Sequence, residues 1–434
     1  MRQLATAAVD PARLATVERL RPVGLLGSIR VLPWMVVPGY RDLICQLRDR
    51  FGLGDDGVDV ARDGPPTRPG ASVVGFPYDF RLGVAVAACR LQREVVARLG
   101  PRRVIVLAHS MGGLVARYWL GPLGGAGYCR ALITLGTPHR GAPKALDLLL
   151  NGVRLGPRPV AGMTSRLLRG AAEVVRGWPS TYDLLPRYRA VRDEDSGGEC
   201  YPHELPAERS FQRQATAAFG MHREIEDAWG RLDPAERPDV LALFARGHAT
   251  PSRAVLRAGR VSVTRTDAEW LPNVGWGGDG TVPAISAYPI ELDDEPLTRR
   301  AVPDRHLPLA TTTAAVKALG EYEAESTQAV CRGDTPEGPW LGLDLDEVIC
   351  AGEPFPVSAE LCGTEDVDGA SAWLWVTAEA PGPPTRLPMT GADGRWHATV
   401  PGLAPGRYRV KVELVNLPRV DQLDNGDVIG VIEP

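Results

Sequence analysis

Two kinds of segment alternate over the first 327 residues. Apolar runs of strand type, rich in β-branched residues, lie at 29–38, 71–81, 104–109, 130–141 and 239–247. Segments with helical spacing of apolar residues separate them, and the clearest are 83–99 and 311–325. Strands that alternate with helices predict βαβ units and a mostly parallel sheet, so we expect an α/β fold over 1–327.

The alternation is lost between 152 and about 235. This segment is rich in arginine, has helical spacing and is interrupted by prolines, which predicts a helical cap over the edge of the sheet. The strand pattern then returns, and 254–266 has the pattern of a hairpin that turns at Gly259.

A third pattern begins after residue 327. The stretch 328–340 contains Gly, Pro and Asp and is typical of a linker. Beyond it, segments such as "SAWLWVTAE" and "GRYRVKVEL" alternate apolar and polar residues between turns. We therefore predict a small antiparallel β-sandwich over 341–434, either Ig-like or transthyretin-like.

Charge and composition exclude several kinds of partner and location. The formal net charge is −4 and no basic cluster is interleaved with aromatic residues, so we expect no nucleic-acid partner. The first twenty residues contain Asp10, Pro11 and Glu18 where a signal peptide needs its apolar centre. No run approaches 18 uninterrupted apolar residues. These patterns predict a cytoplasmic protein.

The cysteines and acidic residues do not have metal-binding spacing. Seven cysteines are scattered without a CxxC pair, so we expect reduced thiols (Cys45, Cys89, Cys129, Cys200, Cys331, Cys350, Cys362). No HExxH motif is present, and the acidic "ELDDE" at 291–295 fits a solvated loop better than a calcium site. We expect neither a metal nor another cofactor.

Candidate chemistry begins at "VIVLAHSMGGLVAR", residues 104–117, where a strand pattern stops at a tight turn and a helix follows. Ser110 lies in this turn, which would expose its hydroxyl at a helix N-terminus. Small residues must flank such a serine, and Ala108 and Gly112 do so, with Ala in place of the first Gly of GxSxG. We predict that Ser110 is a catalytic nucleophile.

A serine nucleophile of an α/β-hydrolase is followed along the chain by an acid and then a histidine. Asp279 lies in the glycine-rich "GWGGDGTVPAISA", and His306 is the one histidine between it and residue 327. Rival carboxylates remain in Asp293, Asp294 and Asp304. The other histidines of this region precede Asp279, and we expect His109 to point away from the serine (His109, His139, His203, His222, His248).

The tetrahedral oxyanion formed on attack needs two backbone donors. One should be the N–H of Met111, the residue after the nucleophile, and the other should come from the loop after the first strand run. In that loop Gly39 permits close approach, so we favour the N–H of Tyr40, with Arg41 second.

Six motifs in order resemble the lecithin:cholesterol acyltransferase-like lipases, which are α/β-hydrolases: "VPGY" (37–40), "PYDFR" (77–81), "AHSMGGLVARYW" (108–119), "LGTPHRGAP" (135–143), "PSTYDLLP" (179–186) and "GDGTVP" (278–283). The resemblance implies Ser110, Asp279 and His306 as the triad and Tyr40 with Met111 as oxyanion donors. It also implies that Asp79 and Arg81 bind substrate, although they could equally form a structural pair. It further implies a mobile lid at 45–70.

Together these features predict a serine esterase or lipase that cleaves acyl esters, with a phospholipid or glycerolipid as substrate and transient contact with a membrane surface. Two alternatives remain. The acyl group could pass to an alcohol, which would make the protein a lipid acyltransferase. Alternatively, the C-terminal sandwich could bind a protein partner that activates the hydrolase domain as an effector.

Overall fold

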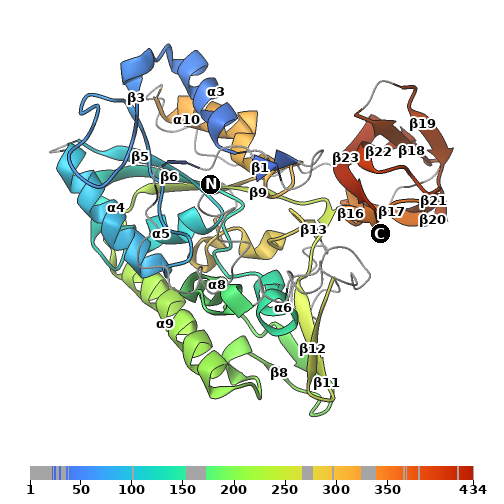
Figure 1. The fold of residues 1–434 in the computed structure, drawn as a ribbon, viewed down its shortest axis with the longest axis horizontal. Coiled ribbons are helices and arrows are strands. Elements are labelled where there is room, and N and C mark those ends of the chain that lie inside the picture. The colour runs from blue at the N-terminus through green and yellow to red at the C-terminus, as the bar shows by residue number, and fades with distance from the viewer. Residues whose placement is uncertain are drawn as a thin grey trace.

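The computed structural model describes residues 22, 24–25, 29–30, 36–37, 39–99, 102–152, 173–265, 277–295, 298–323, 339–364, 367, 369–379, 382–417 and 420–433. Figure 1 shows a larger part of mixed helices and strands, blue to light orange, and a smaller part made of strands, dark orange to red. The predicted linker at 328–340 lies almost entirely outside the described residues, as does 153–172 of the predicted cap.

A four-stranded parallel sheet forms the centre of the larger part. Its order is β14 (Arg299–Val302), β9 (Asp239–Ala245), β6 (Cys129–Leu135) and β5 (Val104–His109). Each neighbouring pair is parallel. The middle strands β6 and β9 are apolar and buried almost throughout because helices cover both faces of the sheet.

The helices form one layer on each face of this sheet (Figure 1). One face packs on α4 (Val84–Leu99), α5 (Met111–Leu120) and α9 (Arg209–Arg231) around Trp119 and Leu132. The other packs on α10 (Thr313–Glu323), and α3 (Arg41–Phe51) lies against α10. This three-layer arrangement fits the expected α/β-hydrolase.

The predicted lid at 45–70 contains regular structure. The end of α3 is followed by η1 (Asp55–Gly57) and by β3 (Val58–Val60), which pairs in parallel with β4 (Val73–Gly75). Arg98 of α4 fastens β3 through an ion pair with the buried Asp59 at 2.9 Å. Only the stretch between β3 and β4 has the loop character expected from its Gly and Pro content.

The predicted cap is not purely helical. Besides α8 (Pro179–Asp183) and α9, its described residues form β7 (Val191–Asp193) and β8 (Glu199–Cys200). Those strands join the predicted hairpin, β11 (Arg253–Arg257) and β12 (Arg260–Thr264), in the sheet order β12-β11-β7-β8. The sequence does not predict this strand pairing, because runs of two or three residues have no detectable periodicity.

The remaining short elements connect these layers: β1 (Ile29–Arg30), β2 (Val36–Val37), η2 (Gly125–Tyr128), α6 (Pro143–Asn151), η3 (Pro202–Glu204), β10 (His248–Ala249), β13 (Gly277–Gly278), η4 (Ala284–Ser286), η5 (Ile290–Leu292) and η7 (Pro308–Thr311).

From residue 340 onward every regular element described is a strand: β15 (Trp340–Asp344), β16 (Val348–Cys350), β17 (Phe355–Cys362), β18 (Ser371–Ala378), β19 (Thr385–Pro388), β20 (Thr390–Ala392), β21 (Arg395–Val400), β22 (Gly406–Leu417) and β23 (Val420–Ile432). They belong to two sheets that share one hydrophobic core. These strands fit the β-sandwich predicted for 341–434.

Candidate active site

Ser110 occupies the turn between β5 and α5, with φ 54° and ψ −133°. The Ser110 N–H donates to the Leu135 carbonyl at 2.9 Å, and the Thr137 hydroxyl donates to the Ser110 carbonyl at 2.9 Å. Both partners come from the end of β6 and the turn after it. The neighbouring strand therefore holds the turn that presents the serine at the N-terminus of α5.

His306 and Asp279 reach Ser110 from two loops on the carboxyl side of the sheet. The His306 Nε2 atom lies 2.8 Å from the Ser110 Oγ atom, and His306 Nδ1 lies 2.6 Å from Asp279 Oδ2. The backbone N–H of His306 also donates to the Asp279 carbonyl at 3.0 Å. The structure thus joins the three residues chosen from the sequence in one chain of hydrogen bonds.

The Asp279 carboxylate is buried but well supplied with donors. Its Oδ1 accepts the backbone N–H groups of Thr281 at 2.8 Å and Val282 at 2.6 Å, which leaves Oδ2 for His306. Burial opposes ionisation, yet His306 and the two N–H groups outweigh it and lower the pKa of Asp279 below its usual value. An ionised Asp279 fixes the proton of a neutral His306 on Nδ1, leaving Nε2 free to accept one from Ser110.

His109 is a residue whose place in the site the sequence did not indicate. Its Nε2–H donates to the His306 carbonyl at 2.8 Å, and its Nδ1 accepts the Tyr40 hydroxyl at 2.9 Å. Burial, with a contribution from His306, lowers the pKa of His109 to about 4, so the ring is neutral at pH 7. His109 therefore holds the backbone of His306, a contact that the sequence around His109 does not indicate.

The expected oxyanion donors lie at two helix N-termini. Met111 is the first residue of α5, where backbone N–H groups have no carbonyl partner within the helix. Tyr40 is the N-cap of α3, and its hydroxyl reaches His109, the residue before Ser110. Arg41, the second choice, begins α3 with an exposed side chain.

Asp79 and Arg81 pair with each other. The Arg81 Nε atom donates to Asp79 Oδ1 at 2.7 Å, and the Arg81 side chain is buried. Among the hydrogen bonds of the described residues, none joins either side chain to the triad. A substrate-binding role for them stays a prediction.

The rival residues have partners elsewhere. His222 donates to the Asp183 carbonyl at 2.8 Å, and His248 donates to the Pro303 carbonyl at 3.0 Å. Asp293 forms an ion pair with an arginine of the turn after β6. Each of these three residues thus has a structural partner other than Ser110.

The part of the chain with assigned coordinates has no group of three or more His, Cys, Asp or Glu side chains placed to hold a metal ion. The cysteines it includes are all free thiols. None of its helices has the length and hydrophobicity required to cross a bilayer.

Comparison with known proteins finds similarity over part of the chain. The family model described as lecithin:cholesterol acyltransferase matches residues 67–199. A relative named phospholipase A(1) LCAT3, from Arabidopsis thaliana, is 33% identical over 95 residues, which make up 20% of this chain and 21% of the relative. The chain thus matches about a fifth of that relative's length.

Two solved structures are similar to the chain, but with low TM-scores. A Bacillus licheniformis lipase, BlEst2 in its propeptide form, is 13% identical with a TM-score of 0.29, covering 82% of this chain and 86% of the lipase. A CARDB domain from Pyrococcus furiosus is 11% identical with a TM-score of 0.17, covering 22% of this chain and 94% of the domain. Scores this low do not bear on the chemistry of the site.

The matched segment 67–199 includes the Ser110 turn, Thr137 and the Asp79–Arg81 pair. The agreement between this match and the motifs confirms the resemblance expected from the sequence. Over this segment the chain is similar to the lecithin:cholesterol acyltransferase-like lipases.

Proposed function

We propose that the protein is a serine-dependent enzyme that cleaves acyl esters of phospholipids or glycerolipids through Ser110, His306 and Asp279. The observation that carries this is the continuous hydrogen-bond chain, 2.8 Å from His306 Nε2 to Ser110 Oγ and 2.6 Å from His306 Nδ1 to Asp279 Oδ2. A serine on a strand-to-helix turn with a histidine base and a buried carboxylate has the parts that acyl transfer requires.

In the first half of the reaction, Ser110 Oγ bonds to the ester carbonyl carbon while its proton passes to His306 Nε2. The N–H groups of Met111 and Tyr40 stabilise the oxyanion, each donor being worth about 3 kcal/mol in comparable sites. His306 then gives its proton to the departing alcohol and an acyl-Ser110 ester remains. Asp279 stays ionised throughout and stabilises the protonated imidazole.

In the second half, His306 removes a proton from the acceptor that attacks acyl-Ser110. Water as the acceptor gives a fatty acid, and a lipid alcohol gives a new ester. Both outcomes share one mechanism, so hydrolase and acyltransferase are alternatives that depend on which acceptor reaches the acyl-enzyme.

Support for a lipid substrate comes from the family match and from the named activity of the Arabidopsis relative, a phospholipase A(1). The same proposal includes a cytoplasmic location and transient contact with a membrane surface. It also includes an Ig-like or transthyretin-like topology for the C-terminal strands. The partner-activated effector stays a prediction from the sequence.

The test compares wild type with Ser110→Ala on phospholipid vesicles that contain a long-chain alcohol. Mass spectrometry quantifies free fatty acid, lysolipid and new ester. We expect these products from wild type alone, since loss of the nucleophile in related triads costs on the order of a millionfold in turnover. The ratio of fatty acid to new ester then separates hydrolysis from transfer.

Ser210→Ala is the matched control, because Ser210 is an exposed serine at the start of α9. It should behave as wild type. Products that persist in Ser110→Ala would remove Ser110 as nucleophile, and a wild type that releases no acyl group would show that the lipid substrate is wrong.

A further inference from the structure

The C-terminal strands meet the larger part of the chain at the loops that carry Asp279 and His306. Strand β10 pairs antiparallel with β13, the strand that leads into Asp279, and parallel with β15 of the C-terminal part. The Leu343 N–H donates to the Gly247 carbonyl at 2.7 Å. One sheet therefore continues from the acid's loop into the C-terminal strands.

Side chains reinforce this junction. The buried Asn425 of β23 donates through Nδ2 to the carbonyls of Gly247 and Leu341, each at 2.9 Å. On the other side of β10, the Thr250 hydroxyl accepts the Gly280 N–H at 2.8 Å. Since Gly280 directly follows Asp279, strand β10 links the C-terminal strands to the acid.

The histidine's loop has its own attachment through Arg305, the residue before His306. Arg305 Nη1 donates to Glu347 Oε1 at 2.6 Å, and Nη2 forms an ion pair with Asp427 Oδ2. The Arg305 and Asp427 side chains are only 11% and 6% exposed, against 52% for Glu347. Asp427 is thus the shielded partner, and a shielded ion pair is little weakened by solvent.

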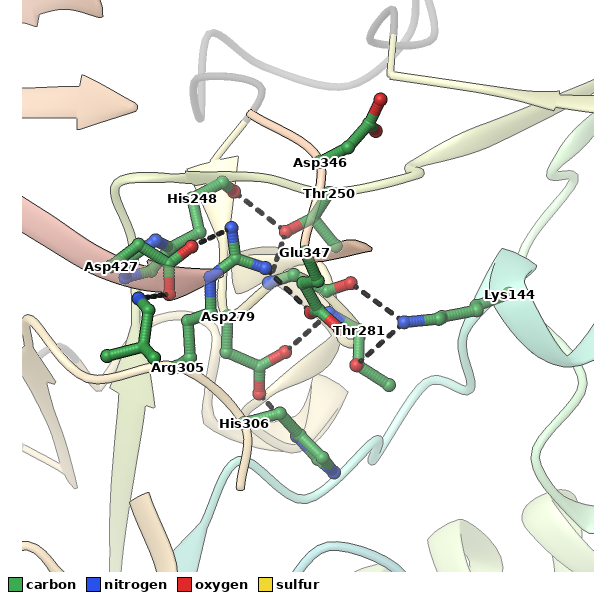
Figure 2. A network of polar contacts seen from close by, with 12 residues as sticks. Lys144, His248, Thr250, Asp279, Thr281, Arg305, His306, Asp346, Glu347 and Asp427 are labelled. Atoms are coloured by element: carbon green, nitrogen blue, oxygen red, sulfur yellow. Dashed lines mark hydrogen bonds and ion pairs between the residues drawn. The ribbon is translucent and has the colours of Figure 1, made fainter. Parts of the chain in front are cut away.

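The same guanidinium lies against the acid's loop. A Cβ atom built on Gly280 would be 2.9 Å from Arg305 Nη1, so the two groups are already in close contact. Figure 2 shows the Arg305 guanidinium between Asp427 and Glu347, next to the loop that carries Asp279 and Thr281. Arg305 therefore connects both catalytic loops to β23.

We propose that Asp427 is a positioning residue: through Arg305 it holds the loop that places His306 against Ser110, which makes the C-terminal strands part of the catalytic centre. The inference rests on the proposed triad. Its physical basis is that a histidine displaced by a fraction of an ångström from its hydrogen bond accepts the serine proton poorly. The experiment must separate this from a general loss of folding.

The test uses the full chain with Asp427→Asn, which keeps the shape of the side chain and removes its charge. Two readouts are taken: kcat and KM for p-nitrophenyl butyrate, and the rate at which a fluorophosphonate modifies Ser110. We expect kcat and the modification rate to fall about tenfold while KM stays unchanged, because substrate contacts are not altered. Asp427→Glu, which retains the carboxylate, should recover part of the loss.

Asp424→Asn is the matched control. Asp424 lies on the same strand and pairs with Lys411 at 2.7 Å, but it is exposed and faces away from the junction. It should keep the wild-type kcat. Thermal unfolding of every variant reports whether it folds, and Arg305→Lys, which cannot bridge two carboxylates as a guanidinium does, replaces Asp427→Asn if that variant fails to fold.

A folded Asp427→Asn with wild-type kcat and modification rate overturns the inference while leaving the triad intact. Equal losses in Asp427→Asn and Asp424→Asn overturn it as well, since they would reflect a general effect on β23. A wild type that neither turns over the ester nor reacts with the fluorophosphonate contradicts the proposed function itself, and the inference falls with it.

Discussion

Ser110 adopts a backbone conformation that residues with a side chain rarely occupy, with φ 54°. Such strain costs about 1–3 kcal/mol and persists only where the surroundings hold it. Here Leu135 and Thr137 do so through hydrogen bonds to its backbone N–H and carbonyl. The strain exposes the hydroxyl, and the residues that maintain it come from another strand.

Substitution of Gly136 tests how closely the backbone packs against Asp279 and His306. Its φ is +54°, and a Cβ atom there would lie 2.8 Å from Asp279 Oδ2 and 3.2 Å from His306 Nδ1. We predict that Gly136→Ala separates the acid from the histidine and lowers kcat for p-nitrophenyl butyrate about 100-fold. Steady-state kinetics with thermal unfolding measures this.

Gly124→Ala is the matched control, because Gly124 has φ +68° but no atom within 4 Å of the added carbon. Both variants should lose about 1 kcal/mol of stability from the left-handed backbone. Only Gly136→Ala should lose activity, and equal kcat values for the two would show that the crowding beside Asp279 is absent.

At the scale of elements, the approach of α5 to the sheet depends on a different glycine from the one the motif indicates. The GxSxG pattern indicates Gly112, yet a Cβ there would come no nearer than 3.7 Å to Tyr78 and 3.9 Å to Ala108. At Gly113 it would lie 2.1 Å from the Thr137 hydroxyl oxygen. The close contact is therefore between α5 and the turn after β6.

We predict that Gly113→Ala lowers the free energy of unfolding by about 2 kcal/mol, because the methyl group must displace Thr137 from a packed turn. Gly112→Ala, the control one position earlier in the same helix turn, should be neutral or slightly stabilising, as alanine favours helices. Urea unfolding of both variants measures the difference. A Gly113→Ala protein as stable as Gly112→Ala would contradict the packing described for α5.

Across the described part of the molecule, buried histidines make stability depend on pH. Burial lowers the pKa of His109 and His222 to about 4, and it also lowers the pKa of His139 and His248 below the usual value. Unfolded histidine has a pKa of about 6.5, so below that pH the unfolded chain binds more protons and stability falls towards pH 4. Asp183 opposes this, because burial raises its pKa to about 6 and the folded state gains from protonating it.

The two histidines with a pKa of about 4 outweigh Asp183. We predict that the free energy of unfolding falls from pH 7 to pH 5, with His109 and His222 each contributing about 2 kcal/mol to the fall. Urea unfolding at the two pH values measures it. His222→Gln should weaken the dependence by one histidine's share, whereas replacing the exposed His397 by Gln should leave it unchanged. A free energy that is flat over this interval would exclude buried neutral histidines.

The sequence by itself determined the elements whose signal is local. The apolar run before Ser110, the small residues after it and the alternating strands beyond residue 340 are short-range patterns, and the observed β5, α5 and C-terminal strands follow them. Asp279 and His306 could be chosen because chain order left few candidates. The family match over 67–199 agrees with the motifs because both depend on short-range sequence patterns.

Only the tertiary structure decided which residues support that site. His109 contacts His306, which lies 197 positions away in the chain. Gly136 lies against Asp279, 143 positions away, and Arg305 pairs with Asp427, 122 positions away. Two-residue strands such as β8 and β10 likewise exist because a neighbour pairs with them. Contacts of this kind depend on how separate segments pack, and no window of the sequence contains both partners.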